Sequence, residues 1–435
     1  MKYALINPNW TFSGSVYFGC REPHLPLEYG YAGALLEREG HEVLVVDGQM
    51  GDLSNSEIRK QVDVFRPDFT VVTTAPSYLF WRCPQPELRV PRETVSRLRG
   101  GDWLMVAVGP HGSVTPRAVL NKLKPDVVVM GEFEEVLPRL AGLAHTTPSS
   151  SAAWKEAASV CYACEEGFFI QGEAHASDMA ALPALCWPAD TIARHRHQHH
   201  RFDGKFTRPG AEMEASRGCP YGCSFCARSG FRDRYRKRTL SAVLEELDNL
   251  MGQGCEYVYF IDEIFMPDRE LLGALGTRDV KFGIQTRIDV WEPEMLDLLG
   301  RAGCVSIEAG VESISAQGRA LLNKSCRLST DELAGLLIHA RENVPFVQAT
   351  LLDSRADAPA AIEEWRRYLH RFGVWTNKPV PMFPYPGSWD YFGRWGAPDD
   401  YAWERAHGHY LKNNQVFSDI QDDQPLPLQL LELGV

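Results

Sequence analysis

The stretch SRGCPYGCSFCARSG, residues 216–230, places three cysteines within eight residues. Cys219, Cys223 and Cys226 follow the spacing C-x3-C-x2-C. Three thiolates are one ligand short of a closed tetrahedral site, and an open coordination position is typical of catalytic rather than structural metal centres. Three cysteines can also hold a [4Fe-4S] cluster and leave its fourth iron free. The stretch therefore predicts a metal centre with one position open to a ligand.

Iron–sulfur and zinc are both compatible with this spacing. A zinc site would need a fourth ligand from elsewhere in the chain, such as Cys255 or a histidine. Gly218 and Gly222 flank Cys219 and let the loop bend tightly around a cluster. The choice between the two metals depends on where the loop lies in the fold.

The bulk composition is that of an ordinary globular protein. The 435 residues are enough for two or three domains, with 44% hydrophobic and 23% charged residues. A net charge of −12 gives no general attraction to nucleic acid or to an anionic membrane. The N-terminal MKYALINPNW lacks the apolar core of a signal peptide, and eleven cysteines fit reduced thiols. We therefore expect a cytoplasmic protein without nucleic-acid or membrane partners.

The N-terminal third alternates short β-rich runs with amphipathic stretches. This alternation predicts an α/β domain over 1–145, with a Rossmann-like parallel sheet covered on both faces. Ligands of such sheets bind at the carboxyl ends of the strands. Residues 146–210 change character and are predicted to be a linker or irregular segment. The predicted strands are KYALI (2–6), EVLVVD (42–47), DFTVVTT (68–74), WLMVAVG (103–109) and DVVVM (126–130).

A second alternating series occupies 211–385 and predicts a partial (β/α)6 barrel. The cysteine loop directly follows its first strand, at the end where such barrels keep their catalytic loops. Residues 386–435 form a C-terminal extension that we expect to pack on the barrel. The predicted strands are AEMEAS (211–216), EYVYFID (256–262), VKFGIQTRID (280–289), CVSIEAG (304–310), PFVQATLL (345–352) and VWTNKPVPMF (374–383).

The motifs at the strand ends of this series resemble those of the radical S-adenosylmethionine (SAM) enzymes. The resemblance rests on CPYGCSFCA (219–227), YFIDEIF (259–265), QTRID (285–289) and GCVSIEAGVES (303–313), in that order. It implies that the three cysteines bind a [4Fe-4S] cluster and that SAM chelates the free iron through its amino and carboxylate groups. It also implies an external electron donor, such as flavodoxin or ferredoxin, whose electron leads to cleavage of SAM.

The same resemblance assigns residues to the SAM site. Phe225, the aromatic residue before the last cysteine, would lie against the adenine, while Arg287 and Glu308 would face the methionine or ribose of SAM. A guanidinium suits the SAM carboxylate, and an anion suits its ammonium and sulfonium. The alternative is that Arg287 and Glu308 pair with each other or with Asp289. Two further candidates end the second strand of the barrel: Asp262 and Glu263.

The N-terminal domain resembles that of the radical SAM class with a cobalamin-binding domain. The stretches PLEYGYAGALLEREGHEVLVVD (26–47), VAVGPHGSVTP (106–116) and VVVMGEFEEVLPRLA (127–141) carry this likeness. It implies cobalamin as a possible further cofactor, with His111 as a candidate contact. The D-x-H-x-x-G motif that supplies an axial histidine in many cobalamin proteins is absent. The domain can therefore hold cobalamin without that ligand, or can have kept its sheet without the cofactor.

The segment FGCREPHLPLE (18–28) clusters Cys20, Arg21 and His24 just beyond the first predicted strand. Because this position follows the carboxyl end of a parallel strand, these residues are candidates for substrate contact. The alternative is an ordered surface loop without a role in binding.

The predicted function is transfer of a SAM-derived carbon group to a small-molecule biosynthetic intermediate. The cobalamin-type resemblance implies C-methylation. An alternative is cobalamin-independent transfer of the 3-amino-3-carboxypropyl group to trivalent arsenic, because NPNWTFSGSVYFGCREPHLPLE (7–28) resembles radical SAM proteins of arsinothricin biosynthesis. A third alternative is a non-catalytic cobalamin or metal sensor.

Overall fold

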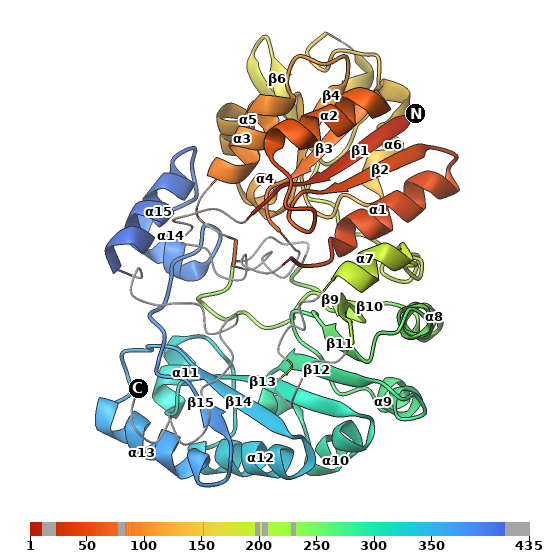
Figure 1. Cartoon of the computed structure of the whole chain (residues 1–435). Coiled ribbons are helices and arrows are strands. Elements are labelled where there is room, and N and C mark those ends of the chain that lie inside the picture. The colour runs from red at the N-terminus through yellow and green to blue at the C-terminus, as the bar shows by residue number, and fades with distance from the viewer. Residues whose placement is uncertain are drawn as a thin grey trace. The chain divides into compact units, whose positions relative to one another are not determined.

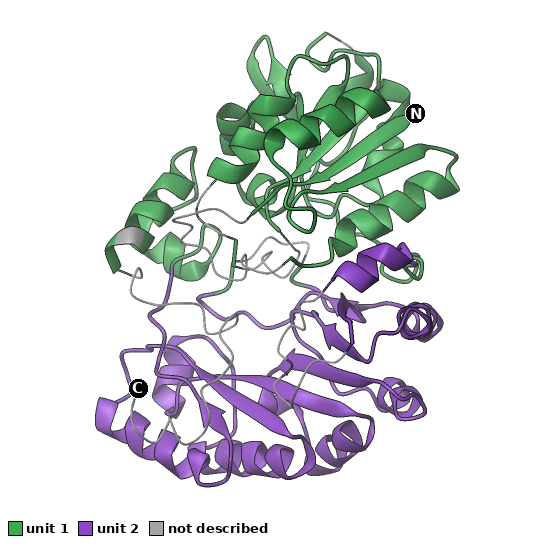
Figure 2. Ribbon diagram, in the orientation of Figure 1, with its two compact units in different colours: residues 1–185, 226–233, 384–415 green, residues 186–225, 234–383, 416–435 purple. Residues whose placement is uncertain are grey.

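The computed structural model describes residues 1–10, 23–76, 83, 84, 86, 88–150, 152–195, 201, 208–227 and 232–413. The chain divides into two compact units (Figure 2). Unit 1 takes its described residues from 1–185, 226–233 and 384–413, and unit 2 takes its described residues from 186–225 and 234–383.

Unit 1 is built on a seven-stranded sheet with the order β2-β1-β3-β4-β5-β6-β7 (Figure 1). Strands β1 to β5 are parallel, and β6 and β7 continue the sheet as an antiparallel hairpin. The central strands are almost wholly apolar because helices cover both faces of the sheet. The strands are β1 (Lys2–Asn7), β2 (Glu42–Asp47), β3 (Phe69–Thr73), β4 (Leu104–Val108), β5 (Val127–Val129), β6 (Val160–Cys164) and β7 (Gly167–Gln171).

The helices of unit 1 bury two separate apolar cores, one against each face of this sheet. Helix α2 shows how the sequence sets their ends: Ser54 and Glu57 form a reciprocal capping box at its start. The helices are α1 (Leu27–Arg38), α2 (Asn55–Phe65), α3 (Arg89–Leu98), α4 (Pro110–Val114), α5 (Pro116–Leu123), α6 (Val136–Arg139), η2 (Ala141–Leu143), η3 (Ala152–Glu156), α14 (Trp389–Trp395) and α15 (Ala402–Asn413).

Two sequence expectations need correction in unit 1. The β6–β7 hairpin lies inside 146–210, which was predicted to be a linker or irregular segment. The prediction missed two short strands that follow a polar stretch and are joined by a tight turn at Glu165 and Glu166, directly before Gly167 (φ 119°). The C-terminal extension was expected on the barrel, but residues 384–413 group with unit 1. Trp403 in α15 belongs to the core between the sheet and its helices.

Unit 2 contains a six-stranded, all-parallel sheet with the order β15-β14-β13-β12-β11-β8. Helices run along the outer side of this curved, open sheet (Figure 1), which confirms the predicted partial barrel. The strands are β8 (Gly210–Met213), β11 (Tyr257–Phe260), β12 (Lys281–Thr286), β13 (Cys304–Glu312), β14 (Phe346–Leu351) and β15 (Trp375–Thr376).

The remaining elements of unit 2 connect or cover these strands. A two-stranded antiparallel ribbon follows β8 and flanks the cysteine loop. Among the described residues, no helix has the length and apolarity to cross a membrane. The elements are α7 (Ala189–Arg194), β9 (Ser216–Arg217), β10 (Arg236–Lys237), α8 (Leu240–Gly252), α9 (Arg269–Leu275), η4 (Ile288–Val290), α10 (Pro293–Arg301), α11 (Ala316–Leu321), α12 (Thr330–Asn343) and α13 (Pro359–His370).

The two faces of the barrel sheet differ in polarity. Ile284, Ile307 and Val347 form one row across β12, β13 and β14. The next row along the same strands contains Gln285, Glu308 and Gln348. Because consecutive side chains of a strand point to opposite faces, the apolar row packs under the helices and the polar row faces the interior of the barrel. The interior therefore presents hydrogen-bonding groups close to the carboxyl ends of the strands.

Candidate functional site

The cysteine loop begins directly after β9, at the carboxyl end of β8. Cys223 is buried, and Cys219 and Cys226 are half-buried. Phe225 is half-buried in the same loop. The three cysteines thus lie on the segment, and at the strand end, where the sequence placed them.

Two acidic residues at the end of β11 hold the entrance to this loop. The carboxylate of Asp262 accepts hydrogen bonds from the Ala215 N–H (2.9 Å) and from the Ser216 hydroxyl. The neighbouring Glu263 accepts a hydrogen bond from the Gly218 N–H at 2.7 Å. Gly218 has φ 86°, a conformation that glycine adopts without a steric penalty. Asp262 and Glu263, predicted as SAM contacts, therefore also fix the backbone that leads into Cys219.

Asp262 is almost completely enclosed. Burial raises the pKa of this carboxyl to about 8, and the two hydrogen bonds from Ser216 and Ala215 oppose that rise. The nearby carboxylates of Glu214 and Glu263 raise the pKa further. The neutral form of Asp262 is therefore favoured near pH 7, which suits a structural brace better than an anionic ligand site.

A turn after α11 holds the middle of the loop. The Ser224 N–H donates to the carbonyl of Leu322 at 2.9 Å. The side-chain amide of Asn323 donates to the carbonyl of Gly222 at 2.6 Å. Asn323 itself is left-handed (φ 50°), a conformation that asparagine tolerates better than most residues. The backbone on both sides of Cys223 is thus fixed by residues about 100 positions further along the chain.

The charges around Cys223 fit a site that binds iron through thiolates. Burial raises the pKa of the Cys223 thiol, while the cations Lys324 and Arg287 oppose that rise and Glu312 adds to it. A cysteine must lose its proton to bind a metal, so buried cations near the sulfur favour the binding form. The donor set and its compensating charges therefore fit a [4Fe-4S] cluster.

Arg287 lies beside this loop and is partly committed to protein partners. It donates to both carboxylate oxygens of Asp289, from Nε at 3.0 Å and from Nη2 at 2.7 Å. Its guanidinium lies over the ring of Tyr221, 3.8 Å from the ring centroid. The alternative pairing with Asp289 is thus present. The buried Nη1 has no hydrogen-bond partner in the described part of the chain and remains available to a ligand.

The sequence did not single out two polar side chains on β14. Gln348 is in register with Glu308 on β13, and Thr350 lies two residues further on the same face. The Gln348 Nε2 and the Thr350 hydroxyl are buried without a hydrogen-bond partner among the described residues. Alternating polar residues in the otherwise apolar VQATLL were the signal that could have found them. Unsatisfied groups on this interior face favour a polar ligand there.

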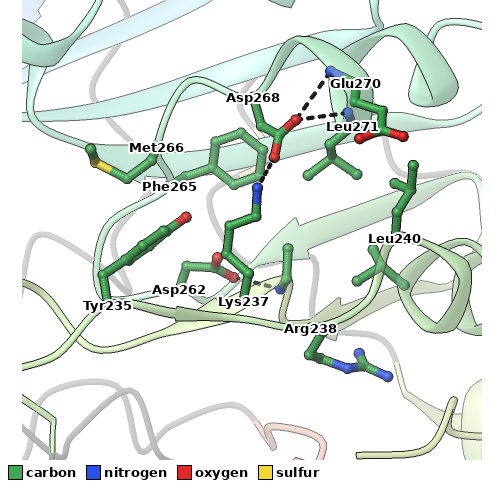
Figure 3. A pocket seen from close by; sticks show the side chains of 12 residues that line it. Tyr235, Lys237, Arg238, Leu240, Asp262, Phe265, Met266, Asp268, Glu270 and Leu271 are labelled. Atoms are coloured by element: carbon green, nitrogen blue, oxygen red, sulfur yellow. Dashed lines mark hydrogen bonds and ion pairs between the residues drawn. The ribbon is translucent and has the colours of Figure 1, made fainter. Parts of the chain in front are cut away.

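A small pocket lies next to Asp262 between the β9–β10 ribbon, α8 and α9 (Figure 3). Lys237 and Asp268 form an ion pair inside it, and Asp268 also caps α9 by accepting from the N–H groups of Glu270 and Leu271. Its volume is about 130 Å³. Pockets for drug-sized ligands measure about 300 Å³ or more, so this pocket is small for a ligand of the size of SAM.

The zinc alternative gains no support from the position of its proposed fourth ligand. Cys255 is buried just before β11, at the amino end of the strand, whereas the cysteine loop follows the carboxyl end of β8. Because β8 and β11 are neighbouring parallel strands, the amino end of β11 and the carboxyl end of β8 lie at opposite ends of the sheet. In the parts of the chain that the structure describes, no three His, Cys, Asp or Glu side chains form a site for a single metal ion.

The candidate cofactor and substrate residues of unit 1 differ in what the structure describes of them. The His111 ring is buried after β4 and lies against Trp403, with ring centroids 4.3 Å apart. His24 is also buried, while Cys20 and Arg21 lie outside the described residues. None of these assignments is tested by the geometry, and all four remain predictions.

One polar group at the carboxyl end of the unit 1 sheet has no partner among the residues that the structure describes. The Thr74 hydroxyl, directly after β3, is buried and makes no hydrogen bond in the described part of the chain. It faces Gly109, where an added Cβ would lie 2.6 Å from the hydroxyl oxygen. Strand ends of this kind are where parallel sheets bind ligands.

Residues 213–354 match the family profile described as Radical SAM superfamily. These residues form a radical SAM domain. The match begins at the last residue of β8 and runs through the cysteine loop to just beyond β14. The predicted family resemblance is thereby confirmed for the barrel.

The similarity to curated proteins extends beyond residues 213–354. An uncharacterized methyltransferase of Pyrococcus horikoshii, PH0819, is 25% identical over 72% of this chain and 66% of its own length. The anaerobic magnesium-protoporphyrin IX monomethyl ester cyclase of Cereibacter sphaeroides is 24% identical over 88% of this chain and 63% of its own length. The chain thus spans slightly less than two thirds of these curated relatives.

A solved structure shares the fold of both halves. The radical SAM methyltransferase TsrM of Kitasatospora setae, determined with cobalamin and a [4Fe-4S] cluster bound, has a TM-score of 0.66. The likeness covers 89% of this chain and 73% of TsrM at 18% sequence identity. At this identity the comparison establishes the fold, and the combination of an N-terminal sheet domain with a radical SAM barrel matches the sequence prediction.

Proposed function

We propose that this protein is a radical SAM transferase that moves a SAM-derived carbon group to a small-molecule substrate. The observation that carries the proposal is the braced cysteine loop at the carboxyl end of β8, within a radical SAM domain. A reduced [4Fe-4S] cluster at such a site supplies the electron that cleaves SAM. Cys219, Cys223 and Cys226 would hold that cluster.

The interior face of the barrel supplies the groups that would bind and orient SAM. The unpartnered Arg287 Nη1 suits the SAM carboxylate. Glu308 and Gln348, in register on adjacent strands, suit the hydroxyl or ammonium groups of the same ligand. The ring of Phe225 would lie against the adenine. Burial of these groups excludes water, which strengthens each contact with the charged ligand.

We further propose that the transferred group is methyl and that cobalamin takes part. The cobalamin-bound TsrM fold and the methyltransferase relative support this assignment. The Thr74 hydroxyl, which has no partner among the described residues, offers a polar contact for a ligand at the carboxyl end of β3 in the unit 1 sheet. His111 lies against Trp403, so we do not assign it as an axial ligand of cobalt. Flavodoxin or ferredoxin would deliver the electron.

Identification of the SAM products tests this function. The protein is reconstituted anaerobically with iron and sulfide, supplied with cobalamin, reduced in the presence of SAM, and analysed by mass spectrometry. 5′-Deoxyadenosine together with S-adenosylhomocysteine is the expected result for radical methylation. Methylthioadenosine would instead indicate aminocarboxypropyl transfer, the alternative from the sequence. Absence of SAM turnover with every reductant would contradict both reactions.

A pair of cysteine variants tests the cluster site itself. Cys223→Ala should abolish binding of the cluster, measured as iron and sulfide per chain after reconstitution. Cys186→Ala is the matched control, because this thiol is exposed and lies outside the loop. A Cys223→Ala protein that keeps its full iron content would contradict the assignment.

A further inference from the structure

A buried ion pair lies close to the cysteine loop and was not anticipated from the sequence. The Lys324 ammonium lies 2.7 Å from Oε1 of Glu312. The two side chains are 2% and 11% exposed. A buried pair of this kind has a large desolvation cost and is weak evidence for a role in stability alone. Because the pair lies close to the cysteine loop, a role in the function of that loop is the better explanation.

The backbone around Glu312 is specialised to place this carboxylate. Glu312 is left-handed (φ 63°) at a register shift between β13 and β14. A non-glycine residue in this conformation costs about 1–3 kcal/mol, and such strain gathers at functional sites. A Cβ at Gly310 would lie 2.6 Å from Oε1 of Glu312, so a side chain there would displace the carboxylate from this position.

Lys324 is placed by the turn that fixes the cysteine loop. Its neighbours in sequence, Leu322 and Asn323, bond to Ser224 and Gly222 on either side of Cys223. The Lys324 N–H itself donates to the Arg319 carbonyl at 2.9 Å, which fixes the turn from behind. Lys324 is therefore tied to the loop through its two preceding residues, by one backbone contact and one side-chain contact.

The pair lies among the charges that surround the loop. Lys324 directly follows Leu322 and Asn323, which contact the residues on either side of Cys223. Arg287 and Asp289 form a second ion pair beside the loop, where the Arg287 guanidinium lies over the ring of Tyr221. The two opposite charges of the Lys324–Glu312 pair therefore lie next to the position where the cluster would be bound.

We propose that Lys324 and Glu312 are positioning residues that set the reduction potential of the cluster held by the cysteine loop. The inference rests on the proposed function, since it requires that the cluster is bound. Reduction adds one negative charge to the cluster, so a buried cation nearby stabilises the reduced state and a buried anion destabilises it. Lys324 raises the potential, and Glu312 limits that rise.

The experiment is a potentiometric titration of the reconstituted protein followed by electron paramagnetic resonance, with iron and sulfide measured on each sample. Lys324→Gln should lower the midpoint potential of the cluster, and Glu312→Gln should raise it. The double variant should lie between the two single variants, because both charges are then removed. Lys281→Gln removes the same charge at the exposed first residue of β12, at the amino end of the strand, and should leave the potential unchanged.

The outcomes separate this inference from the proposed function. A wild-type protein without a cluster signal would contradict the proposed function. A wild-type cluster with an unchanged potential in both single variants would overturn the inference alone. If Lys324→Gln fails to keep its cluster, two other variants test the inference. Glu312→Gln should raise the midpoint potential, and Lys324→Arg, which keeps the positive charge, should leave it near the wild-type value. A different result for either variant would contradict the inference.

Discussion

The carboxylate of Glu263 accepts a hydrogen bond from the backbone N–H of Gly218 at 2.7 Å, one residue before the first cysteine of the loop. Gly218 is buried and left-handed. A buried N–H that loses its acceptor costs about 1–3 kcal/mol. Glu263→Ala should therefore loosen the loop and speed the loss of iron to a chelator, whereas Glu263→Gln, which keeps an acceptor oxygen, should lose iron at nearly the wild-type rate.

The rate of iron release is followed optically after addition of the chelator. Glu294→Ala removes an exposed carboxylate from the first turn of α10 and is the matched control. Equal rates in Glu263→Ala and in the control would show that this hydrogen bond does not hold the loop.

The sequence could predict the strands and the cysteine loop because both are local signals. The barrel strands are short β-rich runs, and the loop follows the first of them closely, with only the two-residue strand β9 and a short connection between them. The contacts that brace the loop could not be predicted in the same way. Asn323 meets Gly222 across 101 positions of sequence. Such pairs depend on how strands and turns assemble, which periodicity does not report.

The misassigned segments have physical explanations of the same kind. Residues 146–210 begin with a polar, serine-rich stretch that resembles a linker, and the hairpin within it is only two short strands. The partner of Trp403 is Thr115, 288 positions earlier, so no local pattern shows that α15 joins unit 1. The roles of Arg287 and Glu308 toward SAM remain predictions, since the structure describes their surroundings without a ligand.

Arg287→Lys tests whether this guanidinium binds SAM. Lysine keeps the charge but has no planar guanidinium. It cannot donate two hydrogen bonds to Asp289, stack on Tyr221 and contact SAM at the same time. We expect the dissociation constant of SAM to rise about tenfold, equivalent to about 1.4 kcal/mol. Anaerobic equilibrium dialysis with the reconstituted protein measures it. A lowered Tm with an unchanged dissociation constant would mean that Arg287 is structural only.

Asp262→Asn tests the neutral state of the Asp262 carboxyl. Burial raises its pKa to about 8 in the folded protein, against about 3.9 in an unfolded chain. Between these values the folded state keeps a proton that the unfolded state has released, so this group makes stability fall as pH rises. Asparagine mimics the neutral form. The variant should therefore lack this pH-dependent loss of stability. Between pH 5 and pH 8, its free energy of unfolding should rise relative to that of the wild type by an amount on the order of 3 kcal/mol.

The free energy of unfolding of the iron-free protein, from denaturant titrations at pH 5 and pH 8, measures this effect. Ser216→Ala is the companion variant. It removes a hydrogen bond that lowers the pKa of Asp262. The decrease in the free energy of unfolding between pH 5 and pH 8 should therefore persist and become larger. A wild-type protein whose stability does not fall more than that of Asp262→Asn over this range would contradict the assignment of a neutral Asp262.

Trp403→Ala tests whether α15 is part of the unit 1 core. Trp403 is 1% exposed and donates through Nε1 to the Thr115 hydroxyl at 2.7 Å. Replacing a buried tryptophan by alanine costs about 3–5 kcal/mol, and its removal also uncovers the His111 ring. We therefore expect a lower Tm together with faster modification of His111 by diethyl pyrocarbonate, located by mass spectrometry.

Two further variants separate the packing of Trp403 from its hydrogen bond. Trp403→Phe keeps an aromatic ring against His111 but loses the bond to Thr115 and part of the ring volume, so it should cost less than Trp403→Ala and leave His111 protected. Tyr401→Ala changes a residue of the same C-terminal segment that is 68% exposed, and it should have little effect on either measurement. If His111 were modified equally fast in wild type and Trp403→Ala, the ring would already be open to solvent. It would then be accessible to a ligand, and a contact between His111 and cobalamin would regain support.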